Sequence, residues 1–598
     1  MRLLTVLGLG LASACAAPLP APERGAEPVP ATTIRPMPRP GELRRLPGHD
    51  TAAPADSPTD PNRKSGLTAV APPQSWDGAD KVPVPDRWRL LDTLGLMTPR
   101  WYDPYNQNTL KGDRPVIGND WFFSLGVISD TTYEPRSLPT PVAPQSTSNA
   151  GAVNVFGDGR QWLANQNLIV ALVLFKGDTT FRPPDLEFRF TPVLNLNYTE
   201  SRERRLLQID PRAGDNRDDQ HLGVQELFAD VHLRNVSERY DFDSLRVGVQ
   251  PFNTDFRGFL FQDNQLGLRL FGTRDNNRYQ YNLGWIRRLE KDTNSGLNAI
   301  EDPLRDDDIF LANLYWQDFP SLGFTSQLTV VHNRNRERNT YYDNNGFLAR
   351  PFSLGNEHPR DYEVTYLGYN GDGHFGRLNL TGSTYWAVGR ESEGVYSQAP
   401  RDIRAGFAAA EVSVDFDWTR LRFSALYGSG DGDPYDDQAN GFDAIFENPV
   451  FAGADTSFWI RQAVPLIGGG GVALSPRNGV LNSLRHSKEH GQSNFTNPGI
   501  ILFGIGSDFD LTPELRISAN GNYLAFDRTA VLEVARNQGD INREIGLDLS
   551  TALIWRPYFI QNIVLRLSGA TLLPGAGYRD LYPDRHPYSV LANLVLSY

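Results

Sequence analysis

The amino-acid sequence predicts an all-β protein, a transmembrane antiparallel β-barrel of about 18 strands with a disordered proline-rich N-terminal extension. Three observations support this fold class. Apolar and polar residues alternate along many segments after residue 118, the connections between these segments are long and short in turn, and the final segment ends on an aromatic residue. Membrane barrels show this pattern because only every second side chain of a strand faces lipid.

Composition excludes several other classes of protein. The 598 residues are 40% hydrophobic and 22% charged, and after the extreme N-terminus they hold no apolar run of the ~18 residues that a membrane-spanning helix needs. A net charge of −13 argues against a nucleic-acid partner, which requires a basic surface. The single cysteine, Cys15, excludes internal disulfides, thiolate metal clusters and covalently attached haem.

The N-terminus is typical of an export signal, which we place at residues 1–16. Arg2 provides a positive start, Leu3 to Leu11 form the apolar core, and Ala12 to Ala14 form a small-residue cleavage site. Cys15 follows directly, so lipidation of a new N-terminal cysteine is an alternative to simple cleavage. In both cases the chain leaves the cytoplasm.

Two segments separate this signal from the predicted barrel. Residues 17–85 contain 16 prolines and almost no aromatic residues, and such a composition predicts a disordered periplasmic tether. Residues 86–117 predict a short helical or plug-like segment, with Asp86 capping a helix that carries Trp88 to Leu96. This helix either docks beside the barrel or plugs the pore mouth.

Residues 118–598 contain the predicted strands. In one of them Phe188 and Phe190 lie on one face, while Glu187 and Arg189 lie on the other. The 18 predicted strands are 118–128, 167–175, 186–198, 222–234, 244–250, 264–271, 277–288, 308–317, 323–332, 360–369, 374–388, 405–417, 419–428, 498–509, 513–525, 543–556, 561–571 and 589–598.

The lengths of the connections suggest which end of the barrel is outside. Odd-numbered connections run to about 13–69 residues and even-numbered ones mostly to about two to ten, as expected for long external loops and tight periplasmic turns. The longest is a predicted external loop at 428–497, and loops of this length tend to be constrictions, lids or partner sites.

The chain end indicates the membrane and the assembly route. The last strand alternates and closes on Tyr598, a pattern that resembles the signal by which bacterial outer-membrane barrels are recognised for insertion. We therefore predict the outer membrane of a Gram-negative bacterium, with membrane lipids and the barrel-assembly machinery as partners. Aromatic residues near the strand ends are expected to form interface girdles.

The loop after the strand at 419–428 reads GSGDGDPYDDQANGFDAIFENPVFAG. With the 18-strand pattern, it resembles the alginate-export family of outer-membrane porins. The resemblance covers residues 118–598 in architecture but only Asp431 to Gly453 as a motif. It implies an anionic polysaccharide or similar solute moving through an arginine-rich lumen. The proline-rich extension departs from the family pattern.

Taking the polar face of each strand as the interior gives the candidate pore-lining residues. The basic candidates are Arg189, Arg234, Arg246, Arg269, Arg288, Arg377, Arg420, Arg422, Arg516, Arg556 and Arg566. The acidic candidates are Glu187, Glu226, Asp230, Glu363, Glu411, Asp415, Asp417 and Asp548. The planar guanidinium suits both a bracing ladder of ion pairs and an anion-selective pore, and the sequence leaves both open.

One cation site is conceivable in the long loop. Asp431, Asp433, Asp436 and Asp437 could provide oxygen ligands to calcium, although their spacing does not complete an EF-hand and a solvated acidic loop is the favoured interpretation. No other cofactor is predicted.

The sequence thus favours a porin-like channel or exporter for an anionic or sugar-like solute. The alternative is a barrel that acts as a sheath or scaffold around a partner such as a multihaem cytochrome. An enzyme is not predicted, because no catalytic set of residues stands out. The tether could in addition reach a periplasmic partner.

Overall fold

The computed structural model describes residues 95, 100, 102–103, 108–140, 157–177, 183–237, 241–351, 354–356, 358–467, 477–485, 488–582 and 587–598. The predicted signal peptide, the tether and nearly all of the predicted helix near Trp88 lie outside the described residues. Of the segment 86–117, the part from Lys111 to Ile117 is a β-strand, β1, which pairs with the start of β2.

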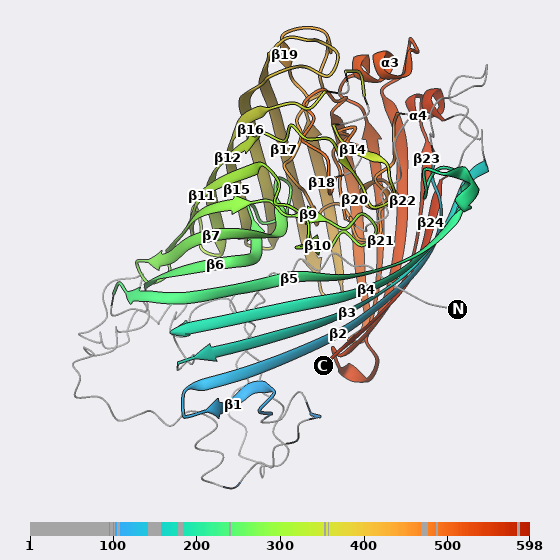
Figure 1. The fold of residues 1–598 in the computed structure, drawn as a ribbon. Helices are drawn as coiled ribbons and strands as arrows, with labels where there is room; N and C mark the ends of the chain where they lie inside the picture. The colour runs from blue at the N-terminus through green and yellow to red at the C-terminus, as the bar shows by residue number, and fades with distance from the viewer. Residues whose placement is uncertain are drawn as a thin grey trace.

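Eighteen antiparallel strands close into a barrel, which confirms the predicted fold class (Figure 1). They are β2 (Trp121–Ser137), β3 (Gly157–Lys176), β4 (Leu186–Glu203), β5 (Asn216–Asn235), β6 (Phe242–Asn253), β7 (Gln262–Arg274), β8 (Tyr279–Arg287), β11 (Asp307–Trp316), β12 (Phe324–Asn335), β15 (Tyr362–Phe375), β16 (Leu378–Glu391), β17 (Arg401–Phe416), β18 (Thr419–Gly428), β20 (Ile500–Thr512), β21 (Leu515–Ala525), β22 (Glu544–Trp555), β23 (Ile563–Pro574) and β24 (Tyr588–Ser597). Pairing of β2 with β24 closes the ring.

The remaining short elements lie in the connections between these strands. They are the strands β9 (Glu290–Lys291), β10 (Asn298–Ala299), β13 (Tyr341–Tyr342), β14 (Leu348–Arg350) and β19 (Gln438–Ala439), the helices α2 (Phe458–Gln462), α3 (Ala530–Arg536) and α4 (Ala576–Leu581), and the 3-10 turns η2 (Pro211–Ala213) and η3 (Pro557–Phe559).

All the long connections lie at one end of the barrel. At the other end, where the C-terminus lies, the turns 376–377, 417–418 and 513–514 have only two residues each. By the rule that holds for outer-membrane barrels, the short turns are periplasmic and the long connections external. The helices α3 and α4 therefore lie on the external side, at the top of Figure 1.

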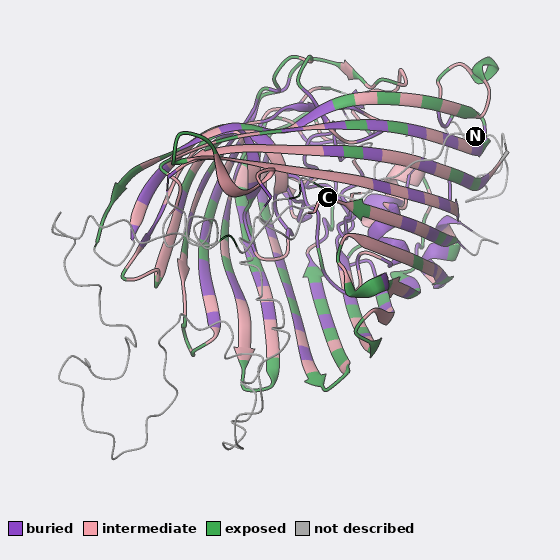
Figure 2. Cartoon of the chain, turned by 90° about the horizontal axis from the view of Figure 1, so that it is seen from below, coloured by how far each residue is buried: buried purple, intermediate pink, exposed green. Residues whose placement is uncertain are grey.

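The outer face of the barrel is a band of exposed apolar side chains. Phe188, Leu196, Trp386 and Phe503 are all largely exposed, and exposed residues alternate with buried ones along the strands (Figure 2). An exposed apolar surface of this extent around a closed barrel is stable only in lipid. The protein is an outer-membrane β-barrel. No helix in the described residues is long and apolar enough to cross a membrane.

The interior of the external half is a packed core. The connection 429–499 between β18 and β20 folds into the barrel, and its residues Phe442, Ile445, Phe458 and Phe495 are completely or almost completely buried. The connection joins the external ends of two strands, as predicted, but most of its described residues fold inward and do not form a solvated loop.

The inner wall that faces this core carries apolar side chains among its polar ones. On β15 the inward side chains include Val364 and Tyr366, which belong to the same hydrophobic cluster as Phe442. Glu363, which precedes Val364, points outward, where it pairs with Arg336 at 2.9 Å. Placing Glu363 in the lumen was therefore an error. The rule that the polar face is inside fails here because an inserted loop needs an apolar wall to pack against.

Candidate functional site

The lumen arginines gather in the periplasmic half of the barrel, below the inserted loop. Most of them face a carboxylate. The ion pairs are Arg189 with Glu187 (3.0 Å) and Glu226 (3.5 Å), Arg246 with Asp230 (2.8 Å), Arg420 with Asp415 (2.5 Å), Arg422 with Asp508 (3.1 Å), Arg516 with Asp510 (2.6 Å) and Arg566 with Asp455 (3.2 Å). These contacts are those of a bracing ladder along the wall.

Arg269 differs from the other lumen arginines. It lies directly opposite Arg246 in the register of β6 and β7, and two like charges in this position repel each other. Asp230 compensates Arg246, but Arg269 donates to the neutral Oδ1 of Asn282 at 2.7 Å, and no carboxylate among the described residues lies within 4.0 Å of it. Both guanidinium groups lie near the ring of Phe271. Within the described part of the chain, Arg269 therefore has no carboxylate in direct contact, although the cross-strand row Glu187, Asp230, Arg246 and Arg269 contains two acidic and two basic residues.

Other predicted lumen residues lie elsewhere. Arg377 and Asp417 occupy the two-residue periplasmic turns, and Arg234 lies at the periplasmic rim, largely exposed and paired with Asp243 at 2.9 Å. Arg556 follows β22 at the periplasmic end. Arg288 is fully buried in the external connection 288–306, where it pairs with Asp307 at 2.9 Å.

A cavity of about 110 Å³ lies between the underside of the inserted loop and the wall. Arg422 and Arg566 line it from the strands, and Arg257 and Asp455 line it from connections. Arg257 also faces Glu411 at 3.5 Å. The sequence did not point to Arg257, because it lies in the short connection 254–261, outside any alternating segment.

Helix α2 of the inserted loop is tied to one part of the wall, between β22 and β2. The carboxylate of Asp548 on β22 accepts hydrogen bonds from the backbone N–H groups of Phe458 (3.1 Å) and Trp459 (3.2 Å), so a strand residue caps helix α2. Glu134 on β2 pairs with Arg461 at 3.0 Å. Buried carboxylates on β22 and β2 therefore fix helix α2 to the wall.

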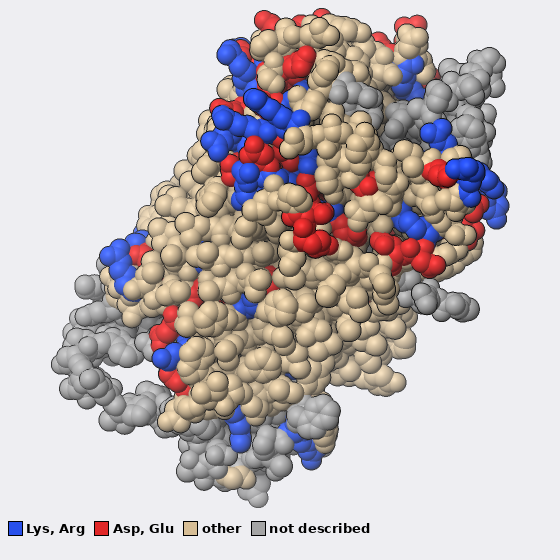
Figure 3. All heavy atoms as spheres, in the orientation of Figure 1, with Lys and Arg blue, Asp and Glu red and all other residues tan. Residues whose placement is uncertain are grey.

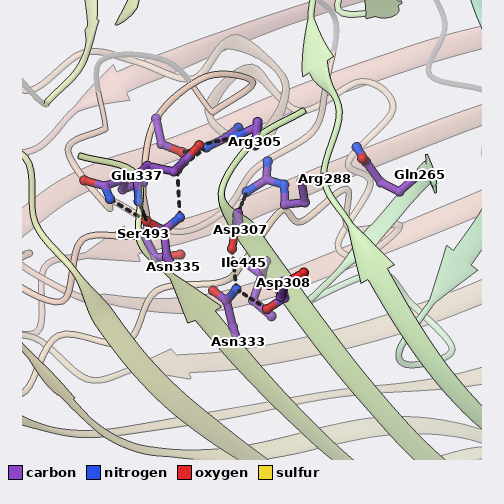
Figure 4. Close-up of polar contacts among 12 residues, drawn as sticks. Gln265, Arg288, Arg305, Asp307, Asp308, Asn333, Asn335, Glu337, Ile445 and Ser493 are labelled. Atoms are coloured by element: carbon purple, nitrogen blue, oxygen red, sulfur yellow. Dashed lines mark hydrogen bonds and ion pairs between the residues drawn. The ribbon is translucent and has the colours of Figure 1, made fainter. Parts of the chain in front are cut away.

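A second set of buried contacts joins three external connections. Arg305, in 288–306, makes a two-pronged ion pair with Glu337, in 336–361, at 2.7 and 2.9 Å (Figure 4). The same guanidinium donates to the backbone oxygens of Glu489 (2.9 Å) and Gly491 (3.2 Å) in the inserted loop. One side chain thus fixes the positions of three loops relative to one another.

Within the loop, Glu447 lies between Lys488 (2.6 Å) and Arg485 (3.0 Å). Burial by itself would raise the pKa of Glu447, but the two cations more than offset this and lower its pKa to about 2. The carboxylate is ionised at neutral pH, and it binds Arg485 and Lys488 to an earlier part of the loop.

The predicted calcium site contains a guanidinium instead. The Nη2 of Arg401 lies 3.0 Å from Asp431 and 3.2 Å from Asp436, and it also donates to the backbone oxygen of Asp433 at 3.3 Å. Burial raises the pKa of Asp431 to about 7 against the opposing effect of Arg401.

This arrangement corrects the calcium hypothesis. Asp437 is exposed and does not join the cluster, and the cation among these acidic residues is Arg401 itself. Among the described residues, no group of three or more His, Cys, Asp or Glu could hold a metal ion.

Tyr598 completes the closure of the barrel. Its backbone N–H donates to the Val127 oxygen at 2.8 Å and its backbone oxygen accepts from the Val127 N–H at 3.2 Å. The Nδ2 of Asn108 donates to its hydroxyl at 2.9 Å, and the Nζ of Lys111 lies 4.0 Å from its ring centre. The segment that includes β1 therefore covers the end of the chain.

Comparison with known proteins was made at three levels. No protein-family model matches the chain, and no curated protein matches it. Among solved structures, *Pseudomonas aeruginosa* OccK2 (OpdF) in complex with glucuronate is similar at 11% identity, covering 79% of this chain and 97% of its own, with a TM-score of 0.41. *Acinetobacter baumannii* OccAB3 has 10% identity, coverage of 80% and 99%, and a TM-score of 0.43.

A BenF-like porin from *Pseudomonas fluorescens* Pf-5 is similar at 11% identity, with coverage of 80% and 98% and a TM-score of 0.41. These values are too low to assign a solute. The fold is that of an 18-stranded outer-membrane barrel. This conclusion rests on the chain's own closed ring of 18 strands. The resemblance of Asp431 to Gly453 to alginate exporters stays a prediction.

Proposed function

We propose that the protein is an outer-membrane channel for small anionic or sugar-like solutes, with the inserted loop 429–499 as its constriction. The observation that supports this most directly is the opposed pair Arg246 and Arg269, in which Arg269 has no carboxylate partner within ion-pair distance. A barrel that needed only bracing would gain stability from a carboxylate at one of these positions. The alginate-export resemblance agrees with the same class of solute.

The two interpretations of the lumen arginines apply to different residues. Arg420, Arg422 and Arg516 each face a carboxylate and contribute little net field, so their role is to brace the wall. Arg269 contributes a field that low-dielectric walls focus into the lumen, which favours anions, most strongly at low ionic strength.

The alternative function, a sheath around a protein partner, fits the structure less well. The described parts of the inserted loop already occupy the external half of the interior, and buried ion pairs hold them there. An enclosed partner would have to displace this core.

Planar-bilayer recordings of the purified protein test the proposal. In a salt gradient the reversal potential of the wild type should show a preference for anions, and Arg269→Gln should reduce that preference. Arg269→Lys, which keeps the charge at the same place, is the matched control and should behave as the wild type does. Absence of any conductance from folded protein would contradict the channel, and equal selectivity of Arg269→Gln and the wild type would contradict the role of Arg269.

A further inference from the structure

A row of alternating charges crosses the outer face of the barrel near its external end. In order along neighbouring strands it consists of Arg287 (β8), Asp308 (β11), Arg334 (β12), Glu363 (β15), Arg390 (β16) and Asp402 (β17). Each member is the direct cross-strand partner of the next. Opposite charges in directly opposed positions attract, so the row is a continuous ladder over six strands.

The arginines of this ladder are accessible to different degrees, with side chains 27% exposed in Arg287, 40% in Arg334 and 73% in Arg390. Asp308 lies between Arg287 (3.0 Å) and Arg334 (2.8 Å), and Arg390 faces Asp402 at 3.2 Å. The side chains of Arg390 and Arg338 are 73% and 75% exposed, so most of each guanidinium still faces outward. Together with the neighbouring Arg336, Arg338, Arg404, Asp306 and Asp361, the ladder forms what we call the outer charged patch.

The outer charged patch lies at the boundary of the lipid-facing band. The indole Nε1 of Trp285 donates to Asp308 at 3.0 Å, and Phe310 and Trp386 are exposed on the same outer face, nearer the middle of the barrel. Tryptophan side chains in this position mark the interface between the hydrocarbon and the polar headgroups. The patch therefore lies at the depth of the headgroups of the outer leaflet.

The patch is not the only set of charges near the external end of the barrel. Outward charged residues also lie near the external ends of β3, β4 and β5, among them Arg160, Arg202 and Asp218. In Figure 3 blue and red residues lie over the region of β11, β12 and β16 and also at the centre and the right of the view. The outer charged patch differs from other charges by its order, because opposite charges face each other directly from strand to strand over six neighbouring strands.

We propose that the outer charged patch binds the phosphate groups of a phosphorylated glycolipid in the outer leaflet. Six arginines face five carboxylates, and each guanidinium has more donors than its carboxylate partner uses. The carboxylates hold the guanidinium planes in place, so less side-chain entropy is lost when two parallel N–H groups engage a phosphate. A glycolipid with two phosphates could span several strands of the ladder.

The test uses the full-length protein in neutral detergent micelles, titrated with diphosphorylated lipid A and followed by native mass spectrometry. The variant Arg336→Gln/Arg338→Gln/Arg390→Gln removes three exposed members of the patch. The matched control, Arg212→Gln/Arg528→Gln/Arg543→Gln, removes three exposed arginines from other external connections. Heat-dependent mobility on gels verifies that each variant is a folded barrel.

We expect the patch variant to bind lipid A about tenfold or more weakly, since charged hydrogen bonds are lost, while the control binds as the wild type does. Wild-type protein should bind fully dephosphorylated lipid A as weakly as the patch variant binds the intact lipid. Unchanged binding by the patch variant, or equally tight binding of the dephosphorylated lipid, would overturn the proposal. If phosphatidylglycerol binds as tightly as lipid A and the patch variant loses this binding, the assignment to a glycolipid is overturned. If the wild type forms a dimer that the patch variant does not form, the patch is assigned to a second copy of the chain.

Discussion

At the scale of single residues, Arg401 shows how a tertiary contact changes the meaning of a motif. The acidic spacing of Asp431, Asp433 and Asp436 is compatible with a metal ion, yet a buried guanidinium from β17 lies among them. Removing one member of a buried ion pair leaves the other charge uncompensated and costs about 3–5 kcal/mol.

We therefore predict that Arg401→Met detaches the segment that contains Asp431 from the wall and makes it sensitive to protease in detergent. Arg401→Lys, which keeps the charge, should lose less protection. Limited proteolysis followed by mass mapping measures this. Added calcium should not restore protection, and recovery by calcium would revive the metal hypothesis.

A second residue-scale prediction concerns the end of the chain. Leu596 faces lipid on the last strand, and an acidic side chain there costs up to roughly 2 kcal/mol, depending on depth. Leu596→Asp should lower the yield of folded barrel, and Leu596→Ile should not. Deletion of Tyr598 removes its two backbone hydrogen bonds with Val127 and should have a similar effect. The heat-modifiable band in outer-membrane fractions reports the folded amount, and normal levels of Leu596→Asp and of the deletion would contradict the prediction.

At the scale of elements, the stability of the inserted loop depends on the ionised carboxylate of Glu447. The lowered pKa of Glu447, about 2 against an ordinary value of 4.5, means that the folded loop favours the ionised carboxylate. The stabilisation is complete above pH 4.5 and is lost as the pH falls through the window from 4.5 to about 2.

Single-channel recordings should therefore become noisier, with larger open levels, as the pH is lowered through this window. Glu447→Gln lacks the ionised carboxylate, and therefore its stabilisation of the loop, at every pH. The current of this variant should be noisy at neutral pH and should change less when the pH is lowered. A variant with the same acid response as the wild type would show that another group controls the loop.

At the scale of the whole molecule, the external connections differ in how accessible they are from outside the cell. Residues 204–215, with the exposed turn η2, lie on the surface, whereas the segment 441–467 is held inside by Asp548 and Glu134. Protease added to intact cells should cut the first segment and spare the second. Mass mapping of the fragments measures this, and cleavage of the wild type within 441–467 would contradict the inserted arrangement. Asp548→Ala should increase cleavage there, because the first turn of α2 loses the two backbone hydrogen bonds that Asp548 accepts.

The sequence by itself determined the strands and their direction. All 18 predicted strands correspond to strands of the barrel, because one lipid-facing side chain in every two is a local requirement that alternation records. The rhythm of connection lengths identified the external end for the same reason. The predicted strands 118–128 and 167–175 are shorter than the observed β2, which ends at Ser137, and β3, which begins at Gly157. The parts that the prediction missed lie at the external ends of these strands, beyond the apolar band, and lack its alternating pattern.

Only the tertiary structure decided what fills the barrel. Tyr366 reads as lipid-facing under the rule of a polar lumen, because the neighbouring Glu363 is assigned to the interior, yet Tyr366 points inward and packs on Phe442 of the inserted loop. Pairing across the lumen, such as Arg461 with Glu134, joins residues more than 300 positions apart, and no local pattern records it. Alternation along a strand determines on which face a side chain lies. Its partner depends on the path of the inserted loop, and that path depends on packing between the loop and the barrel wall.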